Sequence, residues 1–164
     1  AREQGIPHIS VGDLVRQEIA SGSDRGRTLA EQTEGGDLAS PDLVRDLVQD
    51  RLGQPDTSRG FVLDGYPRQP EQLAEFREMD QELGWDGVQV VGLRVTEEEV
   101  TRRLAGRGRA DDSPEVVRHR LEVYREETEP VMNYFQVTGR FTDLDASGPV
   151  DTVAARLRAA VAGR

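Results

Sequence analysis

The sequence predicts an α/β fold in which a parallel β-sheet is flanked by helices. Short apolar runs typical of buried strands occur at Ile6–Ser10, Phe61–Asp64, Val88–Val95 and Phe141–Leu144, and segments with helical periodicity lie between them. Strands that alternate with helices indicate a parallel sheet. Because such sheets bind ligands beyond the carboxyl ends of their strands, we expect functional residues just after these runs.

The helical segments carry recognisable start signals. We expect Asp13 to cap the first helix, and Pro41 occupies the first turn of another helix. Thr96 followed by Glu99 is a capping signature. The expected helices are Gly12–Ala20, the segment from Pro41 to Leu52, Pro70–Leu83, Thr96–Leu104, Pro114–Phe135 and Val150–Val161.

Composition narrows the classes of function. The 164 residues suffice for one compact domain, and the net charge of −10 argues against a general nucleic-acid surface. The chain has no cysteine, and no window approaches the roughly 20 apolar residues of a membrane span. We therefore expect a cytoplasmic protein, and a monomer is the default expectation, because the sequence does not determine the oligomeric state. All 21 basic residues are arginine, which we attribute to codon bias, and a lysine is absent from the sequence.

The segment GFVLDGYPR carries the first candidate site. An apolar strand ends at Asp64, whose carboxylate suits a Mg²⁺ ion held through water. Gly65 allows a ligand to approach the backbone closely, and Arg68 offers a planar fork for a phosphate. An ordinary strand–turn with a capping aspartate is an equal alternative for this motif taken alone.

The segment PHISVGDLVR and an arginine-rich stretch add further cations. Arg16 follows a short strand in the first turns of a helix, where it is either an anion ligand or only a solvated charge. The stretch around Gly106 and Gly108 suggests a polyphosphate clamp, in preference to solvated helix ends with i,i+4 ion pairs. Its arginines are Arg102, Arg103, Arg107, Arg109, Arg118 and Arg120.

Together these segments suggest phosphoryl transfer, which needs positioning and positive charge more than covalent chemistry from the protein. Arg16 and Arg68 could hold an acceptor phosphate, while the other arginines hold the transferring group. No hydrolase-type nucleophile–base pair is evident, and His8 and His119 are too few for a histidine-based metal site.

The ordered motifs H-I-S-x-G-D-L-x-R, D-G-Y-P-R, G-R-x-R-A-D-D and E-T-E-P-V-M-N-Y-F resemble those of adenylate kinases over nearly the whole chain. The resemblance implies a P-loop-kinase-like sheet and the reaction ATP + AMP ⇌ 2 ADP. It implies a mobile AMP-side segment at about 10–39 and a short lid at about 106–116, which lacks cysteine and would carry no structural zinc.

The resemblance also implies roles for individual residues. Asp64 would hold Mg²⁺ through water, and Arg68, Arg103, Arg109 and Arg120 would act in catalysis. ATP would contact Arg103, Arg107 and Gly148. AMP would contact Val11, Arg16, Asp37, Leu38, Ala39, Gly65, Tyr66, Pro67, Arg68, Gln72, Arg109 and Arg120.

Some features depart from the family pattern. The glycine-rich loop, its lysine and the central first strand should precede Ile6, so we expect the 164-residue chain alone to be unstable or nearly inactive. Val11 replaces a usual threonine beside the AMP base, which leaves a UMP or CMP kinase open as an alternative. The competing hypotheses are a nucleotide-binding module without catalysis and a purely structural helical domain whose arginines are solvated.

Overall fold

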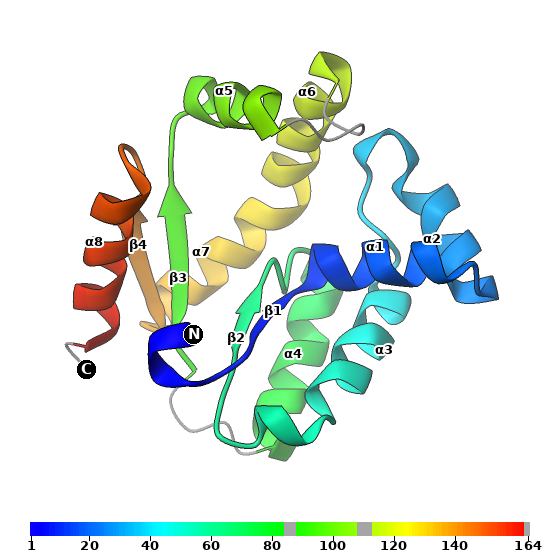
Figure 1. The fold of residues 1–164 in the computed structure, drawn as a ribbon, viewed down its shortest axis with the longest axis horizontal. Coiled ribbons are helices and arrows are strands. Elements are labelled where there is room, and N and C mark those ends of the chain that lie inside the picture. Colours follow the sequence, from blue (N-terminus) through cyan, green and yellow to red (C-terminus); the bar gives the residue numbers. More distant parts are fainter. Residues whose placement is uncertain (84–87, 108–112, 163–164) are drawn as a thin grey trace. The chain divides into compact units, whose positions relative to one another are not determined.

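The computed structural model describes residues 1–83, 88–107 and 113–162. The chain divides into two compact units, Ala1–Glu82 and Leu83–Arg164, and each is described by itself. Figure 1 shows the order of helices and strands along the chain.

The first unit contains a two-stranded parallel sheet. Strand β1 (His8–Ser10) pairs with β2 (Val62–Asp64), so that Ser10 lies opposite Asp64 at the carboxyl end of both strands. The strand bounds are shorter than the predicted ones, although the amide of Val62 also donates to the carbonyl of Pro7 at 2.9 Å. Both chain segments therefore turn toward their helices at the same edge of the sheet.

Four α-helices surround this sheet in the described part of the first unit. They are α1 (Val11–Ser21), α2 (Asp24–Thr33), α3 (Pro41–Leu52) and α4 (Pro70–Leu83), with short 3₁₀ turns at Arg2–Gln4, Glu34–Gly36 and Pro55–Thr57. The prediction that Asp13 caps α1 was wrong, because Ser10 is the N-cap and its hydroxyl accepts from the amide of Asp13 at 3.3 Å.

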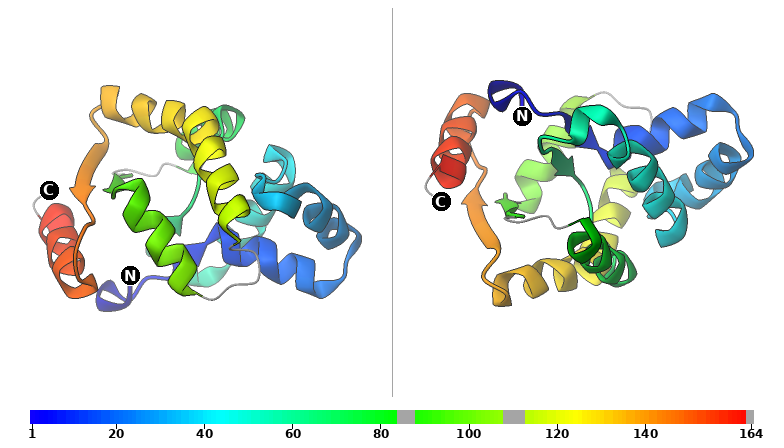
Figure 2. Two further views of the ribbon diagram at one scale, coloured as in Figure 1. Left: turned by 90° about the horizontal axis from the view of Figure 1, so that it is seen from above. Right: turned by 90° about the horizontal axis from the view of Figure 1, so that it is seen from below.

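Helix α2 was not predicted, because its sequence is mostly polar and supplies little apolar periodicity. Ser23 caps it, with its hydroxyl accepting from the amide of Gly26 at 2.9 Å. A Cβ atom at Gly26 would lie only 2.2 Å from the carbonyl oxygen of Glu18 in α1. The glycine thus permits the close approach of α1 and α2, which Figure 2 shows side by side.

A buried apolar core joins the helices of the first unit to its sheet. The side chains that are less than a tenth exposed include Ile9 of β1, Leu29 of α2, Val48 of α3 and Phe76 of α4. Removing this apolar surface from water is the main favourable contribution to the stability of the unit.

The second unit contains another two-stranded parallel sheet. Strand β3 (Val90–Arg94) pairs with β4 (Phe141–Asp145), and Val90 lies opposite Phe141. A Cβ atom at Gly92 would lie 2.3 Å from the ring of Phe141, so glycine makes room for that ring on the sheet.

The helices of the second unit are α5 (Glu97–Arg107), α6 (Pro114–Val123), α7 (Glu129–Val137) and α8 (Val150–Ala162). The predicted cap of α5 is confirmed, because the hydroxyl of Thr96 accepts from the amide of Glu99 at 3.2 Å. Helix α8 lies along β4, and α7 directly precedes β4 in the chain (Figures 1 and 2).

The predicted continuous helix from Pro114 to Phe135 is interrupted by a π-helical turn at Tyr124–Thr128. Pro130 follows this turn closely and has no N–H group, and its ring would clash with a carbonyl of the preceding α-helical turn. We attribute the wider turn to this proline.

The predicted fold class is confirmed: parallel strand pairs are flanked by helices. In the three described stretches of chain, the helices all lack the length and apolar character that crossing a bilayer would require.

Candidate functional site

The first group of candidate residues lies at the carboxyl end of β1 and β2. Asp64 ends β2, and its Oδ2 lies 3.1 Å from His8 Nε2 on the neighbouring strand. The Asp64 side chain is 59 % exposed, so a cation with its hydration shell can approach it. Within the described residues, His, Asp and Glu do not gather in a group of three that could hold a metal.

Gly65 makes the turn that follows β2, and its φ of 79° favours glycine over residues with a side chain. A Cβ atom there would lie 3.2 Å from Arg68 Nη2, so the guanidinium of Arg68 folds back over this turn. Arg68 itself is exposed. The predicted D-G-Y-P-R segment therefore places a carboxylate and a guanidinium around one glycine.

Tyr66 and Pro67 anchor this turn in the core and are joined by a cis peptide bond. The Tyr66 ring packs edge-to-face on Phe76 of α4, with ring centroids 6.5 Å apart. Burial raises the pKa of the Tyr66 hydroxyl, which has no hydrogen-bond partner among the described residues. The backbone of the turn is accordingly fixed by packing on one side, while Arg68 stays accessible on the other.

Gln72 lies in the first turn of α4 and is only 3 % exposed. Its Oε1 accepts from the backbone amide of Arg68 at 2.8 Å, and its Nε2 donates to Oε1 of Gln69 at 2.9 Å. The role of Gln69 was not predicted. The signal that could have found it is its place directly before Pro70, three residues ahead of a glutamine, which is similar to a capping box.

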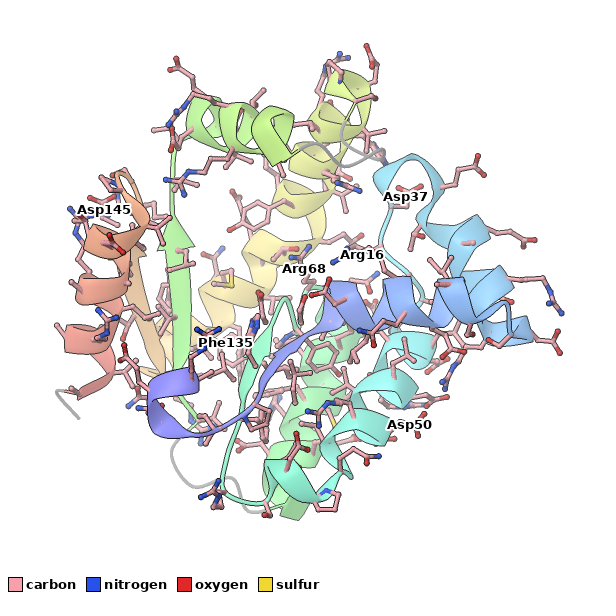
Figure 3. All side chains as sticks on the ribbon, in the orientation of Figure 1. Arg16, Asp37, Asp50, Arg68, Phe135 and Asp145 are labelled. Carbon is pink, nitrogen blue, oxygen red and sulfur yellow. The ribbon has the colours of Figure 1, made fainter. Side chains whose placement is uncertain are left out.

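Arg16 of α1 forms an ion pair with Asp13, one turn earlier on the same helix. Figure 3 labels Arg16 and Arg68, which both lie in this view at the end of the first unit where β1 and β2 end. Val11 is 5 % exposed at the start of α1, so its side chain belongs to the core.

The predicted base-side segment, Asp37 to Ala39, follows α2 and the turn at Glu34–Gly36. Asp37 is exposed and Leu38 is half-buried, whereas Ala39 is 6 % exposed. Just beyond them, the amide of Ser40 donates to Oε1 of Gln32 in α2 at 2.9 Å. The side chain of Gln32 thus ties the end of this segment to the preceding helix.

The second unit brings two predicted ATP-side residues together. Arg103 of α5 donates from Nη2 to the carbonyl oxygens of Ala146 at 3.0 Å and Gly148 at 3.4 Å. Its Nε also donates to Glu99 Oε1 at 2.6 Å. Arg103 therefore joins α5 to the turn that follows β4, which contains Gly148.

A second arginine holds the same turn from α8. Arg156 Nη1 donates to the carbonyl oxygens of Asp145 at 2.9 Å and Ser147 at 3.2 Å, and lies 3.2 Å from Asp145 Oδ2. Asp145 Oδ1 accepts from the backbone amide of Ser147 at 3.0 Å and from its hydroxyl. These bonds from Ser147, together with Arg156, lower the pKa of Asp145.

The remaining arginines of the predicted clamp are only partly placed. Arg102 pairs with Glu99, as does Arg103, which is the i,i+3 and i,i+4 pattern of the alternative interpretation. Arg118 is exposed and Arg120 is half-buried on α6. Arg107 ends α5, while residues 108–112 of the predicted lid, Arg109 among them, lie outside the described residues.

Each unit thus presents guanidinium groups and polar backbone atoms just beyond the carboxyl end of a parallel strand pair. In the first unit these are Arg16, Arg68 and the turn at Gly65, and in the second they are Arg103 and the turn at Gly148. Guanidinium forks and backbone amides are the groups that bind phosphate in proteins.

Comparison with known proteins agrees with this chemistry. The family model described as adenylate kinase matches residues 1–140. The adenylate kinases of Mycobacterium tuberculosis (strain H37Rv) and Mycobacterium marinum are both 44 % identical over 156 residues, which cover 95 % of this chain and 85 % of theirs. That of Mycolicibacterium smegmatis is 43 % identical over 157 residues, which cover 96 % and 86 %. The chain therefore belongs to the adenylate kinase family, whose members are phosphotransferases.

Proposed function

We propose that this protein transfers a phosphoryl group reversibly between ATP and AMP, giving two ADP, as a cytoplasmic monomer. The AMP ligands are Val11, Arg16, Asp37, Leu38, Ala39, Gly65, Tyr66, Pro67, Arg68 and Gln72, and the ATP ligands are Arg103, Arg107 and Gly148. Arg109 and Arg120 are also proposed to contact AMP.

In this proposal arginines bind the phosphates and stabilise the charge that develops during transfer. Arg68 and Arg16 hold the acceptor phosphate, so that one of its oxygens is positioned for in-line attack on the γ-phosphorus of ATP. Arg103, Arg109 and Arg120 stabilise the negative charge on the transferring oxygens. Movement of the segments at about 10–39 and 106–116 excludes water, so that phosphate passes to AMP.

Adenylate kinases use Mg²⁺ with ATP, where it neutralises phosphate charge. Asp64 would hold that ion through water, since a single exposed carboxylate suits a cation that keeps part of its hydration shell. His8, within hydrogen-bonding distance of Asp64 Oδ2, limits the directions in which this carboxylate turns.

The observation that carries the proposal is the turn Asp64–Arg68 in a chain of this family. Gly65 leaves space for the Arg68 guanidinium, because a Cβ atom at this position would lie only 3.2 Å from Arg68 Nη2. The adjoining Tyr66 is buried against Phe76 of α4. A guanidinium positioned over a rigid backbone turn is already organised for a phosphate, so little ordering is required on binding.

The test is a coupled assay of ADP formation by the full-length polypeptide. Arg68→Ala is expected to lower kcat by about 10²–10³-fold, as loss of a transition-state donor does. The matched control is Arg77→Ala, which removes another exposed arginine from α4 outside the motif. Unchanged kinetics for Arg68→Ala would remove this residue from the mechanism, and equal turnover of UMP or CMP would contradict the preference for AMP.

A second assay addresses the absence of lysine from these 164 residues. A P-loop lysine normally reaches the β- and γ-phosphates of ATP, and the 164 residues contain none. We expect a polypeptide restricted to these residues to show no measurable turnover. Substantial ADP formation by that polypeptide would show that the reaction does not need such a lysine.

A further inference from the structure

We propose that Gln69 is a specificity residue, which together with the backbone amide of Arg68 fixes the direction of the Gln72 amide and thereby favours adenine over 6-oxopurines in the monophosphate site. This inference rests on the proposed function, in which Gln72 contacts the base of AMP. The residues that carry it are Arg68, Gln69 and Gln72, all in the first unit.

The hydrogen bonds decide which way the Gln72 amide points. A backbone N–H group can only donate, so the bond of 2.8 Å to Arg68 N requires the oxygen of Gln72 on that side. The nitrogen then faces Gln69, where it donates to Oε1 at 2.9 Å. Rotating the Gln72 amide by 180° would place two donors together at Arg68, and it would break the bond to Gln69 Oε1 unless the Gln69 amide rotated as well.

The same two bonds leave a defined pair of groups for a ligand. A primary amide has two hydrogens and two lone pairs, and the bonds to Arg68 and Gln69 use one of each. Among the described residues the Gln72 amide makes no other hydrogen bond, so one lone pair and one hydrogen remain. Their order is fixed by the amide direction.

That order distinguishes purine bases. Adenine presents an amino donor beside a ring-nitrogen acceptor, which a glutamine amide pairs with in a bidentate fashion. On the Watson–Crick edge of hypoxanthine, an oxo acceptor stands beside an N–H donor, so the same contact needs the amide reversed. A fixed amide therefore penalises inosine monophosphate (IMP) relative to AMP, although the two nucleotides share the same ribose phosphate.

A purely structural explanation predicts a different result. Gln69 directly precedes α4, its carbonyl accepts from the amide of Leu73 at 3.1 Å, and Gln72 lies in the first turn. The two side chains therefore also stabilise the start of the helix. Loss of helix stabilisation would weaken binding of AMP and IMP alike, whereas loss of the amide direction changes the ratio of their dissociation constants.

The experiment measures AMP and IMP binding to the full-length polypeptide by calorimetry. Three substitutions at position 69 are compared: one side chain only accepts hydrogen bonds, one makes none, and one only donates them. Gln69→Glu keeps an acceptor and should retain or increase the preference for AMP. Gln69→Ala should reduce that preference roughly threefold to tenfold, the range expected for one hydrogen bond. Gln69→Lys, which opposes a donor to the Gln72 nitrogen, should reduce it further.

The ratio cancels any effect of the added charges on the shared phosphate. Glu71→Ala is the matched control, because Glu71 is exposed in the same turn of α4 and lies outside the hydrogen-bond chain. A ratio that stays within twofold across the three variants, with AMP still bound, would overturn the role of Gln69. Failure of the unaltered protein to bind AMP would instead contradict the proposed function itself.

Discussion

The turns that follow β2 and β4 each come after the second strand of a parallel pair. One turn is held by a buried neutral hydrogen bond, and the other is held by exposed charged groups. After β2, the neutral and buried amide of Gln72 fixes the backbone at Arg68. After β4, charged and largely exposed groups, Arg103, Arg156 and Asp145, hold the backbone. A buried neutral bond resists salt and pH, whereas exposed ion pairs are screened and titrate, so the two turns should respond differently to the same conditions.

The largest expected effect comes from breaking the neutral contact. Gln72→Met keeps the length of the side chain but leaves the amide of Arg68 without its acceptor, which should lower the free energy of unfolding by about 1–3 kcal/mol. Glu71→Met, at an exposed position in the same turn of α4, is the control. Urea unfolding of both variants and of the unaltered protein measures the difference, and a Gln72→Met variant as stable as the unaltered protein would show that the hydrogen bond contributes little.

A smaller effect is expected from the charged contact. Arg156→Met removes a guanidinium that is 43 % exposed and bonds to the carbonyls of Asp145 and Ser147. Because exposed ion pairs contribute little, the free energy of unfolding should fall by at most about 1 kcal/mol.

The same variant has a functional readout. If the backbone at Gly148 contacts the ATP base, Arg156→Met should raise the KM for ATP more than the KM for AMP. Steady-state kinetics with each substrate varied in turn tests this, and an equal rise in both KM values would separate Arg156 from the ATP side.

Acid should loosen the second turn and leave the first unchanged. The pKa of Asp145 is lowered in the folded protein, so its contribution to stability is present above its unfolded pKa and is lost as pH falls through the folded value. The Arg68–Gln72–Gln69 chain has no group that titrates in this range. Amide exchange followed by NMR at pH values from 6 to about 3 should show loss of protection at Ser147 before Arg68.

Salt should produce the smallest difference. Raising the ionic strength shortens the screening distance from about 10 Å at 0.1 M to about 3 Å at 1 M, which weakens exposed pairs such as Arg156–Asp145. Amide protection at Ser147 should decrease slightly in 1 M NaCl, while protection at Arg68 stays constant. A larger loss of amide protection at Arg68 than at Ser147 would contradict the assignment of the neutral bond to the first turn and of the charged contacts to the second.

The sequence predicted the parts of the molecule that depend on local chemistry. The cap at Thr96 follows from an identifiable pair of residues, and the strand end at Asp64 follows from an apolar run that stops there. The strand predicted to end at Leu144 continues by one residue to Asp145. Helix α2 escaped prediction because its position depends on Gly26 packing against α1, which is a tertiary contact. Asp13 looked like a cap because aspartate and serine are both good caps, and only the backbone decides between them.

Sequence analysis could assign roles to residues of the candidate site, but it could not give the hydrogen bonds that these residues make. Family motifs assigned Gln72 to the base and Gly148 to ATP, whereas the bonds to Gln69 and Arg103 depend on side-chain directions that spacing does not fix. The pairing of Arg102 and Arg103 with Glu99 does follow from helical spacing, and it matches the alternative that the sequence analysis left open.

The π-helical turn Tyr124–Thr128 precedes α7 and determines how α7 is rotated about its own axis, and hence which of its side chains face the core. A π-helical turn holds more residues than an α-helical turn, so deleting one residue from it would leave an α-helical turn. Val131 and Phe135, each no more than 2 % exposed, would then keep facing the core. Such a deletion would, however, bring Pro130 back against the preceding turn. The loss of stability should therefore come from the proline and leave the core contacts of α7 intact.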